Sequence, residues 1–326
     1  MHAVPQGMIF AIYYPVIAVI GIPANLAVIV VLSRRRCGLS VCVIYYLVSM
    51  AVTDLLVIIT VVILNRISGT YFTSSFLSIT PVCSFRSALY FAAISSSVWL
   101  TVAFTFDRFV AISCHELKNK YCNEKMAALI IGIVSVLSCL KNIFIYFIYE
   151  PVYIINNIPW FCSIKVIYYT SPAWAAYDWI WIIFTPWLPF VLILLLNVLT
   201  VRNILVANKA RKRLQTQRSG ENHSDQEMEK RKKSIVLLFS ISGSFILSYL
   251  LLFVMSFYIR IGNVTYSSSY DFTNSSFALQ QSGYMLQVLC SCINPFIYAG
   301  TQSLFRAEIK KALTYLLNPL VKLFKM

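Results

Sequence analysis

The chain has 326 residues, of which 59% are hydrophobic and only 12% are charged. Charged residues are therefore about half as frequent as the roughly 25% of a typical globular protein. A soluble protein of this length could not cover its surface with so few charges, so most of the chain must contact lipid. This excludes a secreted disulfide scaffold, a disordered chain and a typical cytosolic enzyme. The net charge of +15 raises nucleic acid as a partner, and the positions of the basic residues decide that question.

Seven apolar stretches follow one another along the chain, and each has the ~20 residues that a helix needs to cross ~30 Å of hydrocarbon. They cover residues 8–32, 41–64, 82–112, 126–148, 176–207, 232–259 and 278–300. The first is too long for the apolar core of a signal peptide and has no Lys or Arg before it, so we expect it to be retained. The chain has no internal repeat and no Pro- or Gly-rich linker. Residues 1–326 are therefore predicted to form a single all-α membrane domain, a seven-helix bundle.

Most of the 27 Lys and Arg residues fall on one side of this predicted bundle. They cluster after the first helix, between the third and fourth, between the fifth and sixth, and after the seventh. Cytoplasmic loops carry the excess of Lys and Arg, so the alternation predicts an extracellular N-terminus and a cytoplasmic C-terminus in a multi-pass plasma-membrane protein. Topology and anionic lipid then account for the positive charge, and nucleic acid is not an expected partner.

Two of the nine cysteines, Cys83 and Cys162, fall on the predicted extracellular side, where the environment is oxidising. A bridge between them would hold the loop between the fourth and fifth helices over the mouth of the bundle. The alternative is a pair of free thiols. Two N-x-S/T sequons, at Asn263 and Asn274, lie in the predicted extracellular loop between the sixth and seventh helices and are candidates for glycosylation.

Several polar residues lie inside the predicted helices, where each is costly unless it is paired or functional. Asn25 is in the first helix, Asp54 in the second and Ser97 in the third, and Ser291 and Asn294 are in the seventh. If these groups face one another inside the bundle, Asp54 can remain ionised and hold a sodium ion or waters. The alternative is a protonated Asp54 that serves as a hydrogen-bonded packing group. No other metal or cofactor is predicted.

An acid–arginine pair, Asp107-Arg108, precedes Phe109 at the predicted cytoplasmic end of the third helix. About 37 Å of helix separates Cys83 from Arg108, which places the two at opposite faces of the membrane. The pair is either a snorkelling pair at the interface or a latch that opens.

These residues, in this order, resemble the rhodopsin-like (class A) G-protein-coupled receptors over essentially the whole chain. The matching features are Gly21 to Asn25, Met50 to Asp54, the Cys83/Cys162 pair, Asp107-Arg108-Phe109, Pro189, Asn294-Pro295 to Tyr298, and Phe305. The resemblance implies a short amphipathic cytoplasmic helix 8 at about 302–313. It also implies a receptor that binds an extracellular ligand and activates a heterotrimeric G protein, with arrestin and a receptor kinase as further partners. The residues implied in activation are Asp107, Arg108, Phe109, Asn294, Pro295 and Tyr298. More narrowly, residues 49–54, 97–107 and 241–247 resemble the probable G-protein coupled receptor 139 group of orphan receptors.

By family position, the resemblance also implies a ligand pocket in the outer half of the bundle. Its candidates are Tyr90, Phe91, Ile94, Trp181, Tyr249, Phe253, Gln280 and Tyr284, with Arg86 and Arg260 near the mouth. Tyr90 stands where amine receptors carry an Asp, and the seventh helix has no Lys, so neither a monoamine nor retinal is expected. Relatives in the narrower group respond to aromatic amino acids or short peptides, and an aromatic cup with arginines at its rim suits such ligands. The alternatives are ordinary helix packing for the aromatics and snorkelling for the arginines.

The sequence also departs from the family pattern, most clearly in the sixth helix. Tyr249 replaces the usual Trp, and Leu251 stands where the family has a Pro. Asn197 replaces a Tyr in the fifth helix, and the fourth helix lacks its usual Trp. These changes raise the alternative of a degenerate receptor with little or no G-protein coupling.

Two other classes of membrane protein are less well supported. An enzyme is not predicted, because His2, His115 and His223 all lie outside the seven helices and no catalytic motif is present. A channel or transporter would need a continuous path of polar residues, whereas Asp54 is the only charged residue at mid-membrane depth.

Overall fold

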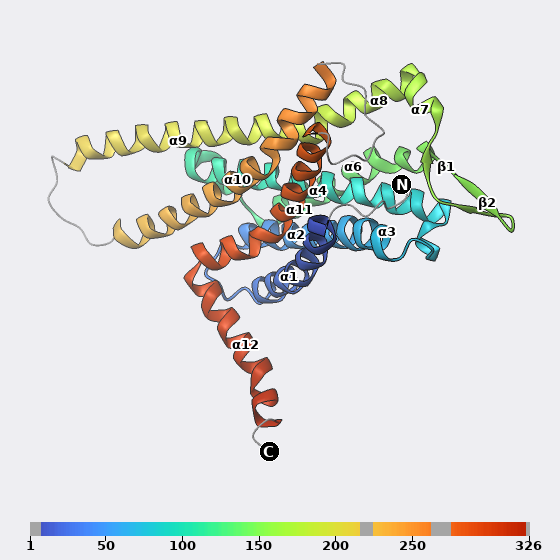
Figure 1. Ribbon diagram of the computed structural model, residues 1–326. Helices are drawn as coiled ribbons and strands as arrows, with labels where there is room; N and C mark the ends of the chain where they lie inside the picture. Colours follow the sequence, from blue (N-terminus) through green and yellow to red (C-terminus); the bar gives the residue numbers. More distant parts are fainter. Residues whose placement is uncertain (1–7, 216–223, 262–274, 324–326) are drawn as a thin grey trace.

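The computed structural model describes residues 8–215, 224–261 and 275–323, and long helices make up most of it (Figure 1). The first half contains α1 (Met8–Ser33), α2 (Val41–Val57), the π-helical η1 (Ile58–Ile67), α3 (Ser68–Tyr71), η2 (Phe76–Ser78), α4 (Thr80–Ser113), α5 (His115–Tyr121), α6 (Glu124–Asn142) and η3 (Ile143–Ile148). The second half contains α7 (Val166–Thr170), α8 (Pro172–Ile182), the π-helical η4 (Ile183–Trp187), α9 (Leu188–Gln215), α10 (Ser224–Ile261), α11 (Ser275–Thr301) and α12 (Ser303–Leu323).

Six helical segments among the described residues are long and apolar enough to cross a membrane. The seventh predicted stretch corresponds to α11, which has 27 residues but carries more polar side chains. Several of these, including Gln281, Gln287, Ser291 and Asn294, are buried within the bundle. The lower hydropathy of α11 therefore reflects polar groups that face other helices and not the lipid.

Most helices extend beyond their predicted ends. The predicted 41–64 helix continues through η1 and α3 to Tyr71, and the predicted 232–259 helix begins at Ser224. The predicted helix 8, at 302–313, corresponds to α12, which runs to Leu323. Hydropathy marks only the lipid-embedded part of a helix, and strong helix formers such as Lys, Arg, Glu and Gln continue it into water.

A small β-ribbon lies in the loop between α6 and α8, and the sequence did not predict it. The ribbon pairs β1 (Tyr149–Glu150) with β4 (Ser163–Ile164), and β2 (Tyr153–Ile155) with β3 (Ile158–Trp160). Asn156 and Asn157 form the turn between β2 and β3 with φ of 50° and 60°. Asn tolerates this left-handed conformation, which two-residue hairpin turns require.

The ribbon projects from one end of the bundle, and the joined ends of α9 and α10 extend beyond the opposite end (Figure 1). We call these the Cys83 end and the Arg108 end, after the α4 residues near each. Two apolar clusters fill the interior, one around Ile94 and Tyr249 and the other around Phe104 and Tyr298. Large apolar side chains also point outward, as lipid-facing helices require; Leu247, for example, is 73% exposed.

Gly21 allows α1 to lie close to its neighbours. A Cβ at this position would come within 2.5 Å of Cys292 Sγ in α11 and 2.6 Å of Ile58 in η1. Small residues permit such close approach of membrane helices. This contact brings the polar side chains of α1, α2 and α11 within reach of one another.

Candidate functional site

A buried polar network lies at the middle of the bundle. Asp54 of α2 is 1% exposed, and both of its carboxylate oxygens accept hydrogen bonds. Ser97 Oγ of α4 donates to one oxygen at 2.8 Å, and Asn294 Nδ2 of α11 donates to the other at 2.8 Å. Asn25 Nδ2 of α1 donates to the Ser291 carbonyl at 3.0 Å. The structure therefore brings together all five residues that the sequence grouped, and they connect four helices.

At the Arg108 end, the Asp107 and Arg108 side chains form an ion pair within α4. Asp107 is 0% exposed and Arg108 is 7% exposed, so the pair is packed inside the protein. An arginine that snorkels would extend its guanidinium toward water instead. The buried geometry differs from that of a snorkelling pair, and the opening of the pair as a latch stays a prediction. Phe109, the third residue of this motif, is only partly buried.

Two cysteine thiols surround this pair, and the sequence reasoning did not find them. Cys42 Sγ of α2 donates to Asp107 Oδ1 at 3.1 Å, and Cys122 Sγ lies 3.6 Å from the Asp107 carbonyl oxygen. Burial, together with the Asp107 charge, raises the pKa of the Cys122 thiol to about 11. Cys122 is therefore a neutral thiol at physiological pH. No spacing rule could have revealed these contacts, because both thiols come from outside α4.

Near the end of α11, the Tyr298 side chain packs against α12. Its ring is 1% exposed and meets the Phe305 ring edge-on, with 6.2 Å between the centroids. Arg306 Nη1 donates to the carbonyls of Ala299 and Gly300 at 2.8 and 2.9 Å, which caps the last turn of α11. Pro295 lies inside α11, next to Asn294 of the central network. The activation residues predicted on α11 thus extend from the central network to the Arg108 end.

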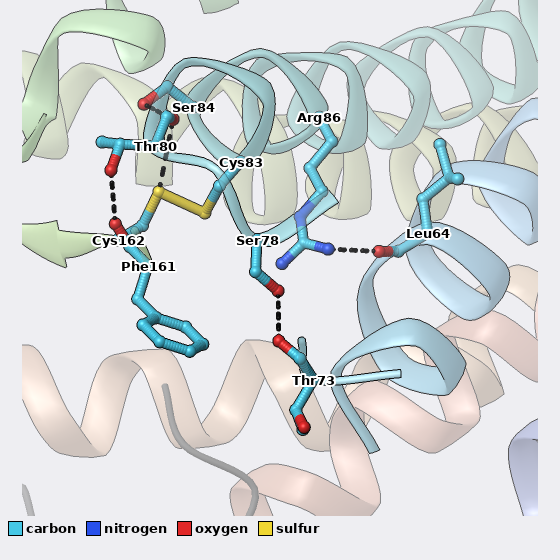
Figure 2. Close-up of a disulfide and its surroundings, with 9 residues drawn as sticks. All are labelled: Leu64, Thr73, Ser78, Thr80, Cys83, Ser84, Arg86, Phe161 and Cys162. Atoms are coloured by element: carbon cyan, nitrogen blue, oxygen red, sulfur yellow. Dashed lines mark hydrogen bonds between the residues drawn. A yellow bond between two sulfur atoms is a disulfide. The ribbon is translucent and has the colours of Figure 1, made fainter. Parts of the chain in front are cut away.

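At the Cys83 end, a disulfide joins Cys83 of α4 to Cys162, as Figure 2 shows. The two Cα atoms are 6.4 Å apart, and the bridge closes a separation of 79 residues. Thr80 Oγ1 donates to the Phe161 carbonyl at 2.7 Å, and Phe161 N–H donates to the Ser78 carbonyl at 2.7 Å. The predicted bridge is confirmed, and it holds the β-ribbon against the start of α4. Asn263 and Asn274, the predicted glycosylation sites, lie outside the described residues.

Residues 24–298 match the family model described as 7 transmembrane receptor (rhodopsin family). This span covers the central network, the Asp107–Arg108 pair and the disulfide. The chain belongs to the rhodopsin family of seven-transmembrane receptors. The predicted family and its all-α membrane fold are therefore confirmed, and the protein is a multi-pass membrane receptor of a signalling class.

The aromatic pocket candidates of this receptor come from α4, α8, α10 and α11, and Tyr90 packs against the apolar cluster that contains Ile94 and Tyr249. Phe91 contacts Tyr90 and Trp181 edge-on, with ring centroids 4.7 and 5.1 Å apart, which connects α4 to α8. On α10, Tyr249 stacks on Phe245 at 4.2 Å. Tyr249 is 5% exposed, and Ile94 of α4 packs in the same apolar cluster.

Other pocket candidates lie on α10 and α11. Phe253 of α10 stacks on Phe190 of α9, with centroids 4.4 Å apart. Gln280 Nε2 donates to Tyr284 Oη at 3.4 Å. Arg260 belongs to α10, but its side chain lies outside the described residues.

Arg86 of α4, predicted at the mouth of the pocket, makes a structural contact. Its Nη1 donates to the Leu64 carbonyl of η1 at 2.7 Å, as Figure 2 shows. Carbonyl groups in a π-helix deviate from the regular α-helical bonding pattern and become available to side chains. Arg86 therefore joins α4 to η1, while its Nε is buried without an acceptor in the described residues; its role at the mouth of a ligand pocket stays a prediction.

Two asparagines, Asn197 of α9 and Asn142 of α6, accept hydrogen bonds from neighbouring helices. Asn197 of α9 accepts a hydrogen bond from Ser242 Oγ of α10 at 3.1 Å. Asn142 of α6 accepts one from Trp181 Nε1 at 3.1 Å, and the neighbouring Lys141 Nζ donates to Thr185 Oγ1 at 2.7 Å. Sequence reasoning missed Lys141 and Asn142 as partners of the Trp181 region, although a Lys inside an apolar stretch was a signal.

Proposed function

We propose that this receptor binds an extracellular small molecule or short peptide at the Cys83 end and activates a heterotrimeric G protein at the Arg108 end. In this proposal the N-terminus is extracellular and the C-terminus cytoplasmic, as the distribution of Lys and Arg predicts. Membership of the rhodopsin family supports an extracellular ligand and a G protein as partners. Arrestin and a receptor kinase are proposed as further cytoplasmic partners.

The observation that carries this proposal is the buried pair of Asp107 and Arg108. Arg108 is bound by its own neighbour and lies 7% exposed, so it cannot contact a protein partner in this conformation. A G protein that binds Arg108 must compete with Asp107 for the guanidinium. Breaking a buried ion pair is costly unless a new partner replaces it. The pair therefore acts as a latch whose opening is coupled to G-protein binding.

Coupling can be tested in cells with sensors for several G-protein classes and a screen of aromatic amino acids and short peptides. We expect Arg108→Ala to abolish the response while surface expression stays largely intact. Arg202→Ala, which changes an exposed arginine of α9, is the matched control and should signal normally. Equal signalling by Arg108→Ala and the unmodified receptor at matched expression would refute the role of Arg108.

Aromatic amino acids and short peptides are the ligand class that we propose. The contacts between Tyr90, Phe91 and Trp181 support an aromatic recognition surface, since aromatic rings prefer edge-on and offset contacts with one another. The narrower resemblance to the probable G-protein coupled receptor 139 group points to the same ligands. Glycosylation of Asn263 and Asn274 would be compatible with an extracellular loop there.

We also propose a sodium site at Asp54. Asn25 Oδ1 and Asn294 Oδ1 are buried and have no hydrogen-bond donor in the described residues, so both are available to a cation. A carboxylate with hydroxyl and amide oxygens is a ligand set suited to a hard cation. Asp54, Ser97, Ser291, Asn294 and Asn25 would then hold the ion between four helices.

A receptor with little or no coupling is the second candidate, and α10 favours it. Tyr249 is stacked and buried where the family has a Trp, and α10 has no proline from Ser224 to Ile261. A helix that bends less easily would couple ligand binding to the Arg108 end less well. Silence of every G-protein sensor with a well-expressed receptor that binds its ligand would support this candidate.

A further inference from the structure

Arg66 lies between two tyrosine rings at the Cys83 end of the bundle. Its guanidinium carbon is 5.5 Å from the centroid of Tyr14 in α1 and 5.8 Å from the centroid of Tyr284 in α11. A guanidinium at this distance from an aromatic ring is attracted by the negative face of the ring. Three helical segments, α1, η1 and α11, thus meet at one cation. Arg66 was not among the residues that the sequence assigned to the pocket.

The π-helical segment η1 places Arg66 in this position. Wider turns rotate the residues that follow them relative to a regular α-helix, and such segments recur at functional sites. Asn65 Nδ2 donates to the Thr60 carbonyl at 2.6 Å and stabilises the irregular turn. Arg86 Nη1 donates a hydrogen bond to the Leu64 carbonyl of the same segment. Arg86 thus has a backbone acceptor in η1, whereas the side-chain contacts found for Arg66 among the described residues are with aromatic rings.

The charge of Arg66 is not matched by the described part of the protein. No carboxylate there lies within ion-pair distance of its guanidinium, although Arg35, Arg108, Lys233 and Lys311 each have one. The Arg66 side chain is only partly buried, so an ion can reach it. A carboxylate that reached this guanidinium could form charge-assisted hydrogen bonds with it. Aromatic rings orient a guanidinium but do not neutralise its charge.

A second group at the same place also lacks a partner. Tyr14 is 3% exposed, and its hydroxyl is buried without a hydrogen-bond partner in the described residues. A phenol hydroxyl that is left unpaired in an apolar interior costs free energy, so such groups are normally bonded. Arg66 offers N–H donors and Tyr14 an O–H donor beside them. A carboxylate, with two acceptor oxygens and a negative charge, complements both.

We propose that Arg66 and Tyr14 bind the carboxylate of the ligand, so that the receptor recognises an aromatic carboxylate such as an aromatic amino acid or the C-terminus of a short peptide. This inference rests on the proposed function, in which a small ligand enters at the Cys83 end. The Tyr284 ring also contacts the Arg66 guanidinium, with 5.8 Å between the guanidinium carbon and the ring centroid. The structure thus assigns recognition of the carboxylate to Arg66, whereas Arg86 donates to the Leu64 carbonyl.

The test is direct binding to the purified full-length receptor, measured as the shift of its thermal unfolding temperature. The probes are L-phenylalanine and 3-phenylpropionate, each compared with its amide. We expect the carboxylates to bind the unmodified receptor at least about tenfold more tightly than the amides, and Arg66→Gln to remove this preference. Tyr14→Phe should lose part of it, and Arg66→Lys should retain part of it.

Arg86→Gln is the matched control. It should lower the unfolding temperature without ligand but keep the preference for carboxylates. Equal binding of acids and amides by the unmodified receptor, no binding of either, or an unchanged preference in Arg66→Gln would each overturn the proposal. Asp271 lies in the sequence between α10 and α11, outside the described residues. A double-mutant cycle in which Arg66→Gln and Asp271→Asn are fully coupled without ligand would also overturn the proposal, since Arg66 would then belong to an internal ion pair.

The unfolding shift does not depend on G-protein coupling, so the two proposals fail in different ways. Carboxylate binding without any sensor response would refute coupling and support the Arg66 site. A sensor response to aromatic amides that is equal in Arg66→Gln and the unmodified receptor would support coupling and refute the Arg66 site.

Discussion

A few polar side chains determine how the helices are hydrogen-bonded to one another inside the bundle. Asp54 shows this most clearly, because each of its two carboxylate oxygens is bonded to a different helix. The Asn25 and Asn294 amide oxygens beside it remain without donors in the described residues. A buried acceptor that no protein group satisfies needs a water or a cation, because the cost of leaving it unpaired is about 1–3 kcal/mol. These two amide oxygens are therefore the groups of the network that a water or a cation would contact.

If the cation is sodium, its binding should stabilise the unliganded receptor and weaken agonist binding, because the two effects are linked. We expect NaCl to raise the unfolding temperature of the purified receptor relative to choline chloride at the same ionic strength. Asp54→Asn should remove this difference, since an amide lacks the negative charge. Asp178→Asn, on α8, is the control and should keep it. A sodium effect of the same size in Asp54→Asn would show that the carboxyl group is only a packing element.

At the scale of single elements, α10 differs most from the pattern of the family. Its backbone runs from Ser224 to Ile261 with no proline, and the Phe245 and Tyr249 rings stack along one side. Ser242 also donates to Asn197 of α9. A helix without proline retains all of its backbone hydrogen bonds and resists bending. We expect these features to favour the conformation in which the Asp107–Arg108 ion pair is intact.

Restoring the family residues in α10 should therefore raise basal signalling. We expect the double variant Tyr249→Trp/Leu251→Pro to have higher ligand-independent activity than the unmodified receptor. Tyr249→Trp alone, which leaves the backbone ladder intact, should change basal activity less. Surface expression must be measured in parallel, because an inserted proline can cost ~3 kcal/mol where neighbours cannot satisfy the freed carbonyl. Unchanged basal activity in a well-expressed double variant would exclude helix stiffness as the limiting feature.

At the scale of the whole molecule, the disulfide joins the β-ribbon to the long helix α4. The β-ribbon is short, and two-stranded ribbons are marginally stable by themselves. Cys162 and the Thr80–Phe161 hydrogen bond attach it to α4, the helix that also carries Asp107 and Arg108 at its far end. The loop between α6 and α8 is thus fixed to the helix bundle at the Cys83 end.

Removing either half of the bridge should have the same effect as removing both. We expect Cys83→Ser and Cys162→Ser each to lower surface delivery and the unfolding temperature, since closing so long a loop contributes roughly 2–5 kcal/mol. The double variant should be no worse than either single variant. Cys139→Ser, which changes an exposed free cysteine, should behave like the unmodified receptor. Additive losses would mean that the two cysteines act separately.

Hydropathy predicted the membrane helices and marked Asp54 as a polar residue within them, the distribution of Lys and Arg placed Cys83 and Cys162 on the same side, and the family resemblance gave Arg108 its predicted role. They do so because burial in lipid dictates residue type along the chain, and family motifs keep fixed positions. The side of the membrane on which each end lies stays a prediction from Lys and Arg. The β-ribbon was missed because its strands are too short for an alternating pattern, although Asn156 and Asn157 indicate the turn.

The tertiary structure alone decided which side chains meet. Arg66 and Arg86 look alike in the sequence, as basic residues near the predicted outer face, yet one lies between Tyr14 and Tyr284 and the other binds a backbone carbonyl. The reason is physical: the direction of a side chain depends on how each helix is rotated, and the π-helical turn in η1 changes that rotation without any mark in the hydropathy. Contacts between helices that are far apart in the sequence follow from how the helices pack, and the periodicity of a single helix does not predict that packing.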